Sequence, residues 1–155
     1  MNITQALPKL VTFDEFIAWY PENSGVRYEL YDGVIVEMTP PVGEHEEIKG
    51  FLMARVVIAY TKYHRPFFIP NQAIVKPVKS ESGYFPDVLL LNKPNLKSEP
   101  LWEKSSTVTQ GDSIPLVIEV VSTNWRDDYY KKLADYEEIG IPEYWIVEDL
   151  SLIHI

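Results

Sequence analysis

The sequence contains no cysteine, which excludes disulfides, thiolate metal sites and cysteine nucleophiles. It also has no apolar run as long as a membrane span. The first ten residues lack the basic start and the apolar core of a signal peptide. From these absences we expect a soluble, cytoplasmic protein with no membrane partner.

Positive charge is scarce as well. The chain has 14 Lys and Arg against 23 Asp and Glu, a formal net charge of −9. Nucleic-acid-binding proteins usually carry a basic patch, because phosphate contacts supply most of their non-specific affinity. The bulk charge therefore argues mildly against nucleic acid, and a DNA-binding face must be local or be completed by metal ions and a second subunit.

Several sequence signals for cofactors are missing too. There are three histidines, none at metal-ligand spacing, so a zinc site is not expected. His45, at the start of a predicted helix, fits a cap-region or surface histidine better than a ligand. Neither a GxGxxG pattern nor a P-loop is present, so nothing indicates a nucleotide cofactor.

The length and composition suit one folded unit. The chain has 155 residues, 46% of them hydrophobic, which is enough for a single core. We therefore expect one domain over residues 1–155. Residues 151–155 are more apolar than is usual for a free chain end. This pattern allows for a domain that is truncated at its C-terminus.

The hydrophobic periodicity predicts a mixture of helices and strands. A capping box at Thr12 and Glu15 predicts a short helix to about Tyr20, and Asp32-Gly33 is a strong hairpin signal. Long helices are expected over residues 44–63, with a stripe of Ile48, Leu52, Val56 and Ala59, and over residues 127–139. The remaining expected segments are strands at 67–69 and 72–76 (a bent pair), 85–91, 116–121 and 143–148, with a long loop over 92–113. The strand–helix–strand run over 116–147 predicts a parallel pair, so the sheet should be mixed.

Two acids lie inside otherwise apolar strand-like runs. Asp87 belongs to the run at residues 85–91, and Glu119 to the run at 116–121. A buried carboxylate needs a cationic partner, and neither run contains Lys or Arg, so a divalent cation is a real candidate. Asp87 alone also fits a turn or cap acid, whereas Glu119 between Ile118 and Val120 is hard to explain without a role.

This pattern suits metal-dependent phosphodiester hydrolysis. That chemistry needs oxygen ligands for Mg²⁺ or Mn²⁺, a positioned water and a cation near the developing charge. Asp87 and Glu119 on neighbouring strands would supply ligands, and the backbone carbonyl of Val120 could add another. Lys132, on the following helix, is long enough to reach the strand ends. Without such a role, Asp128 and Lys132 would be an ordinary exposed i,i+4 pair.

An ordered set of short motifs resembles the PD-(D/E)XK, restriction-endonuclease-like superfamily, and more narrowly the putative restriction endonuclease family, a domain of unknown function expanded in cyanobacteria. Each motif is weak alone, but their order covers nearly the whole chain. The matching segments are residues 28–33 (YELYDG), His45 within 40–45, 85–88 (FPDV), 118–122 (IEVVS), 128–136 (DYYKKLADY) and 140–145 (GIPEYW).

The resemblance implies an α/β fold in which a restriction-endonuclease-like mixed β-sheet is flanked by helices. It implies Asp87 and Glu119 as metal ligands, Lys132 as the cation beside the attacking water or scissile phosphate, and Glu29 as an acid near the same cluster. Glu29 fits an edge-strand acid about equally well. In relatives further strands follow the segment that ends at Trp145.

The sequence therefore predicts a Mg²⁺- or Mn²⁺-dependent endonuclease-like hydrolase that cleaves DNA. Cutting a duplex requires two sites, so we expect a homodimer. One alternative is a catalytically silent module with the same fold, used for binding or assembly, which the net charge favours. Another is a glycosidase that uses Asp87 and Glu119 as its carboxylate pair.

Overall fold

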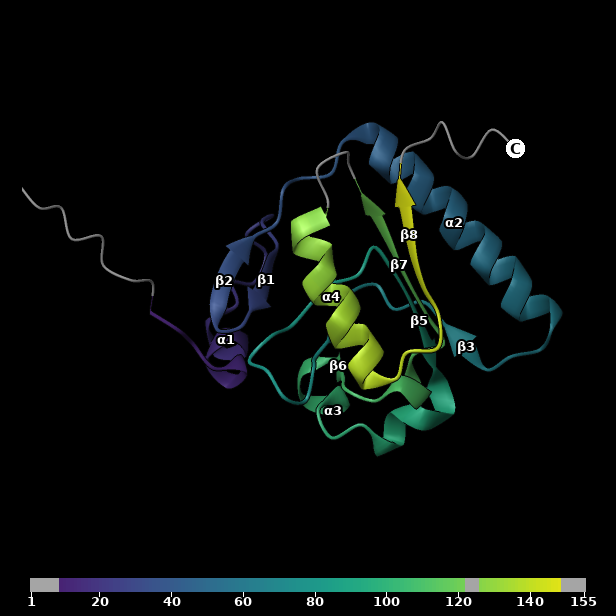
Figure 1. The fold of residues 1–155 in the computed structure, drawn as a ribbon. Helices are drawn as coiled ribbons and strands as arrows, with labels where there is room; N and C mark the ends of the chain where they lie inside the picture. The colour runs from purple at the N-terminus through teal and green to yellow at the C-terminus, as the bar shows by residue number, and fades with distance from the viewer. Residues whose placement is uncertain (1–8, 122–125, 149–155) are drawn as a thin grey trace, which may run out of the picture.

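A computed structural model describes residues 9–121 and 126–148, without the side chains of residues 126–128. A four-stranded sheet lies at its centre, in the order β3-β5-β7-β8. Two long helices and a separate hairpin layer surround it (Figure 1). The elements are α1 (Phe13–Trp19), β1 (Tyr28–Tyr31), β2 (Val34–Glu37), α2 (Gly43–Lys62), β3 (Phe67–Phe68), β4 (Ile74–Val75), β5 (Val88–Asn92), α3 (Trp102–Ser105), β6 (Thr107–Val108), β7 (Leu116–Val121), α4 (Arg126–Ile139) and β8 (Tyr144–Glu148).

The central sheet is mixed, as predicted. β5 pairs antiparallel with both β3 and β7, whereas β7 pairs parallel with β8. The parallel pair is joined through α4, which is the crossover that the pattern over residues 116–147 predicts. β7 therefore has hydrogen-bonded neighbours on both sides, and all six of its residues are buried.

The alternation of side chains in β5 and β7 directs the two faces of the sheet toward different helices. Val88 and Ile118 pack with Val56 of α2 on one face. Leu89 and Val117 pack with Tyr136 of α4 on the other. Because strand residues alternate between faces, Glu119 points to the α4 face. α2 and α4 thus cover opposite faces of the sheet.

The N-terminal part forms its own layer beside α4 (Figure 1). Thr12 and Glu15 form the predicted capping box on α1. Asp32 and Gly33 both have positive φ in the β1–β2 turn, as the hairpin signal predicts. Phe13 and Phe16 of α1 are buried in the core that also contains Leu30 of β1. This packing holds β1 against the body of the protein.

The buried stripe of α2 differs from the prediction at its end. Ile48 and Val56 are buried and Leu52 is partly buried, but Ala59 is exposed. Tyr60, four residues after Val56, packs against the sheet instead. The contact continues at i+4 spacing, so Ala59 turns away from the core.

The strands predicted at 67–69 and 72–76 do not form a bent pair with each other. β3 pairs with β5 in the central sheet, and β4 pairs in parallel with β6. The chain leaves one sheet at Pro70 and joins another, because each short strand finds its hydrogen-bonding partner in a distant segment. The local pattern around Pro70-Asn71 carries no information about those partners.

The segment 92–113, predicted as a loop, contains α3, β6 and two 3-10 helices at Lys93–Ser98 and Gly111–Ser113. Buried Glu99 organises it. The carboxylate of Glu99 accepts hydrogen bonds from the backbone N–H of Thr109 (2.8 Å) and Gln110 (2.9 Å) and from the Ser113 hydroxyl (2.6 Å). A buried acid can therefore be satisfied in this protein by neutral donors alone.

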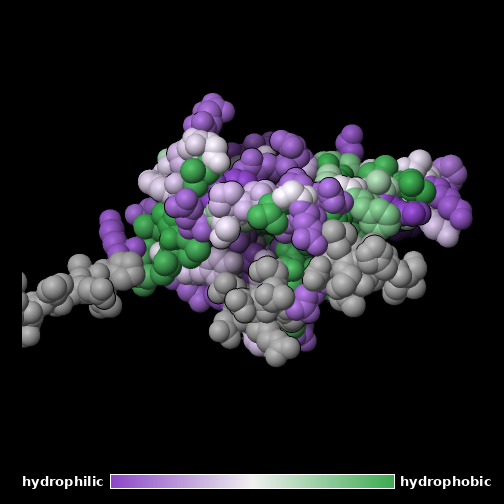
Figure 2. All heavy atoms as spheres, turned by 90° about the horizontal axis from the view of Figure 1, so that it is seen from above, coloured by the Kyte–Doolittle hydropathy of each residue, from purple (hydrophilic) through white to green (hydrophobic). Residues whose placement is uncertain are grey.

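The surface is mixed in polarity. Seen from above, hydrophobic side chains gather toward both ends of the molecule, with hydrophilic residues between them (Figure 2). Val36 of β2 and Phe51 and Ile58 of α2 are among the exposed large hydrophobic residues. Across residues 9–121 and 126–148, no helix has the length and apolarity to cross a membrane.

Two glycine substitutions should change stability in opposite directions. A Cβ on Gly111 would lie 2.3 Å from the carbonyl oxygen of Gly140, so Gly111→Ala should lower the free energy of unfolding by about 1–3 kcal/mol. A Cβ on Gly50, within α2, would meet nothing, so Gly50→Ala should raise it by up to about 1 kcal/mol. Urea unfolding measures both changes. Equal stability of the two variants would contradict the close approach of Gly111 and Gly140.

Candidate functional site

Glu119 is buried on β7, between β5 and β8. Its residue is 2% exposed, and its Oε1 atom lies 3.4 Å from Lys132 Nζ and accepts a hydrogen bond from the Tyr136 hydroxyl at 3.3 Å. Burial raises the pKa of Glu119 to about 8 against the opposing effect of Lys132, and the nearby charges of Asp87 and Glu29 add to the rise. The local environment therefore makes the negative charge costly and places one cation against it.

Lys132 enters this buried region from α4. Its side chain is 3% exposed, and Nζ donates to both oxygens of Glu29, at 3.0 and 3.2 Å, as well as approaching Glu119. Burial alone would lower the pKa of Lys132, but Glu119 and Glu29 hold it well above its usual value. The alternative of an exposed helix pair is therefore wrong for Lys132, and the side chain of Asp128 lies outside the described part.

Glu29 has further partners that fix its carboxylate. Oε2 accepts a hydrogen bond from the backbone N–H of Phe85 at 2.7 Å, and Oε1 accepts one from the Tyr31 hydroxyl at 3.1 Å. Glu29 is 4% exposed, so it is not a solvated edge-strand acid. Glu29, Lys132 and Glu119, which we call the acid–lysine cluster, are brought together as the sequence predicts.

Tyrosine rings surround the ammonium group. Lys132 Nζ lies 5.0 Å from the centre of the Tyr129 ring, 5.4 Å from Tyr84 and 5.9 Å from Tyr31. Such rings attract a cation and exclude water. They therefore keep the acid–lysine cluster in a medium where its electrostatic interactions are strong.

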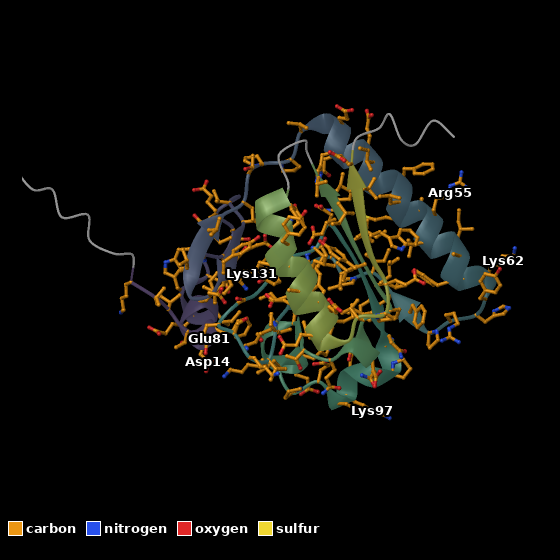
Figure 3. All side chains as sticks on the ribbon, viewed as in Figure 1. Asp14, Arg55, Lys62, Glu81, Lys97 and Lys131 are labelled. Carbon is orange, nitrogen blue, oxygen red and sulfur yellow. The ribbon has the colours of Figure 1, made fainter. Side chains whose placement is uncertain are left out.

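Lys131, the neighbouring lysine, takes a different direction. Its Nζ donates to the Tyr84 hydroxyl and to Asp135, both at 2.8 Å, and its side chain is 27% exposed. It lies between α4 and the β1–β2 hairpin (Figure 3). Lys132 alone of the two lysines reaches the sheet.

Asp87 immediately precedes β5 and is turned toward β7. Its Oδ2 atom accepts a hydrogen bond from the backbone N–H of Val120 at 2.8 Å, and Oδ1 lies 3.3 Å from His45 Nε2. Burial by itself would raise the pKa of Asp87, but these contacts with His45 and Val120 hold it below its usual value. Asp87 is therefore more than a turn acid, because its carboxylate links two strands.

His45 lies in the first turn of α2 and belongs to this site, whereas the sequence pattern favoured a cap-region or surface histidine. It is partly buried, and Nε2 lies 3.1 Å from the carbonyl oxygen of Val120 in addition to its contact with Asp87. Contact with two oxygens requires a hydrogen on Nε2. The sequence signal for this role of His45 was its place within the matching motif at residues 40–45. Its position near a helix start gave no such signal.

The donor atoms fit a hard cation in their chemistry. The Asp87 carboxylate and the Val120 carbonyl both face the point where His45 Nε2 lies, and oxygen donors suit Mg²⁺ or Mn²⁺. Glu119, the next residue along β7, is directed to the acid–lysine cluster. In the part of the chain that the structure describes, no three His, Cys, Asp or Glu side chains are grouped as around a metal ion. The metal ligands stay a prediction.

Comparison with known proteins gives a family match and structural relatives. The model of the Uma2 family, described as "Putative restriction endonuclease", matches residues 13–151. A crystal structure of a putative nuclease belonging to DUF820 from Anabaena variabilis ATCC 29413 has 19% identity and a TM-score of 0.65, and the match covers 89% of this chain and 74% of that one. No curated protein matches the chain. The predicted α/β fold with a mixed sheet flanked by helices is confirmed.

Replacing Lys132 should show how much the acid–lysine cluster contributes to the free energy of unfolding. Lys132→Met should lower the free energy of unfolding by about 3–5 kcal/mol, because Glu29 then stays buried without its cation. Adding Glu29→Gln should recover part of that loss, which a double-mutant cycle in urea measures. Lys62→Met, at the exposed end of α2 (Figure 3), is the control and should change stability by less than about 0.5 kcal/mol. Equal effects of Lys132→Met and Lys62→Met would contradict the buried ion pair.

Proposed function

The chain belongs to the Uma2 family of putative restriction endonucleases, which confirms the predicted resemblance, and from this we propose a metal-dependent endonuclease-like hydrolase that cleaves phosphodiester bonds of DNA. The observation that supports it most is the acid–lysine cluster beside Asp87. A lysine buried between two acids, with a third acid nearby, is a costly arrangement. Such arrangements of perturbed groups concentrate at functional sites.

We propose that Asp87, Glu119 and the carbonyl of Val120 hold Mg²⁺ or Mn²⁺. A bound ion of this kind supplies a more acidic water and stabilises charge on a phosphoryl oxygen. The role of the protein is to hold these ligand oxygen atoms in place. Asp87 is fixed by the Val120 N–H, and β7 is held on both sides by hydrogen-bonded strands, so the ligands have little freedom to move.

Lys132 is the proposed cation beside the attacking water and the scissile phosphate. Glu29 is a positioning residue, because it holds the ammonium with two hydrogen bonds and is itself fixed by Phe85 N–H and Tyr31. A preorganised cation of this kind stabilises charge that develops in the transition state without having to reorient. The tyrosine rings exclude water and strengthen that effect.

The partners follow from the substrate. Cleavage of both strands of DNA requires two sites, so we propose a homodimer. A DNA substrate is consistent with the cytoplasm, which stays a prediction. The net charge of −9 means that contacts with phosphates must be local.

A second candidate is a catalytically silent module with the nuclease fold. The observation that favours it is the internal satisfaction of the acids: Glu29 and Glu119 are already bonded to Lys132, and Asp87 to Val120 and His45. A protein of this kind would bind DNA or a partner without using a metal. Metal binding separates the two candidates.

Metal binding should depend on Asp87. Asp87→Asn keeps the side-chain size but removes the charge, so its affinity for Mn²⁺ should fall by at least about 10–100-fold, the loss seen even for residues that only orient ligands. Isothermal titration of Mn²⁺ and plasmid nicking on the same samples measure the effect. Asp14→Asn, in α1 at the lower left of Figure 3, is the matched control. It should leave both Mn²⁺ affinity and nicking unchanged.

The outcomes discriminate sharply. Loss of both Mn²⁺ binding and nicking in Asp87→Asn alone would support the metal nuclease. Wild-type protein that binds no Mn²⁺, even with DNA present, would contradict it and favour the silent module.

A further inference from the structure

A pocket of about 460 Å³ opens beside Asp87, between α2 and the segment 69–73. Lys49, Gly50 and Met53 of α2 form one wall, the segment 69–73 forms another, and Pro86 and Asp87 close it toward the acids. Pockets of this size hold one small organic ligand rather than a folded partner. Because Asp87 belongs to the pocket wall, a ligand here would lie against one of the proposed metal ligands.

Two cationic side chains line this pocket. The guanidinium of Arg27 lies 5.5 Å from the centre of the Phe85 ring, which holds it in place, and its Nε atom is buried without a hydrogen-bond partner. Lys49 is close enough to Asp87 to help lower the pKa of that carboxyl. The acids Glu46 and Asp87 also line the pocket, so its two cations are matched by two acids, whereas the whole chain has 14 Lys and Arg against 23 Asp and Glu. A buried donor without a partner indicates a missing acceptor.

The other lining groups differ in character. Met53 and Ile69 are apolar, and Asn71 and Gln72 add amide groups at the exposed side. If the ligand were a simple anion, the two cationic side chains would be enough to bind it. A flat ring with polar edges, joined to a phosphate, would use both kinds of lining.

We propose that this pocket binds one unpaired nucleotide of the DNA strand next to the scissile phosphate, with Arg27 and Lys49 on its phosphate and the base against Met53 and Ile69. This inference rests on the proposed function. A base inside a duplex is stacked and paired, so a nucleotide that enters a protein pocket must be single-stranded or turned out of the duplex. The protein then selects DNA with an unpaired nucleotide at the cleavage site.

Binding of fluorescein-labelled (dT)12, followed by anisotropy with Ca²⁺ in place of Mg²⁺, tests the pocket. Arg27→Gln and Lys49→Gln should each weaken binding about 10-fold or more, because each removes a charged donor from a phosphate. Arg55→Gln and Lys62→Gln are the controls, since both side chains lie on the far part of α2 and point outward (Figure 3). They should weaken binding by less than about fivefold, as exposed charges do.

A steric variant tests the same pocket without changing charge. Gly50 lines the pocket, and a Cβ there meets nothing within 4 Å, so Gly50→Leu should fill space without disturbing α2. It should weaken (dT)12 binding by a factor similar to Arg27→Gln, whereas Gly50→Ala should not. Wild-type protein should also prefer (dT)12 over the (dT)12·(dA)12 duplex by about 10-fold or more.

Failure of this inference is distinguishable from failure of the proposed function. Wild-type protein that binds Mn²⁺ and nicks plasmid, while Arg27→Gln, Lys49→Gln and Gly50→Leu bind (dT)12 no more weakly than the controls, would overturn the nucleotide pocket alone. Equal or tighter binding of the duplex would also overturn it. Wild-type protein that neither binds (dT)12 nor nicks plasmid would overturn both.

Discussion

The ammonium group of Lys132 between Glu29 and Glu119 is the contact on which the arrangement of the layers depends. It connects β1, β7 and α4, which belong to the hairpin layer, the central sheet and the helix that covers it. None of the three charges could be buried alone, because each would lose its hydration without compensation. Together they require the hairpin, the sheet and α4 to meet at one place.

β7 organises both parts of the site through the alternation of a strand. Glu119 points to the α4 face and joins the acid–lysine cluster, while the backbone of Val120, one residue on, bonds Asp87 and His45. Asp87 reaches that backbone because it immediately precedes β5, whose Val88 pairs with Ile118. One buried strand thus sets the spacing of acids that come from distant parts of the chain.

The acids of the two apolar runs could be predicted, although Asp87 lies just before β5 and not within it, and several of their partners could not. Glu119 is recognisable because a carboxylate inside an apolar run is expensive, and Asp87 by the same argument with less force. Lys132 was identified chiefly through the family resemblance, since a lysine on an amphipathic helix is ordinary. His45 was interpreted as a cap-region or surface histidine, because a helix start explains a histidine well enough. The pairing of β3 and β4 was wrong because distant partners leave no local trace, and buried Glu99 went unnoticed in a segment that looks like a loop.

The pair Glu29–Lys132 also has a consequence for the order of events in folding. The two residues are 103 positions apart, so their contact forms only after most of the described chain has found its place. Before α4 docks, Glu119 and Glu29 have no cation between them. Docking of α4 therefore brings, in one step, the counter-charge of the two buried acids and the cation that is proposed to act in cleavage.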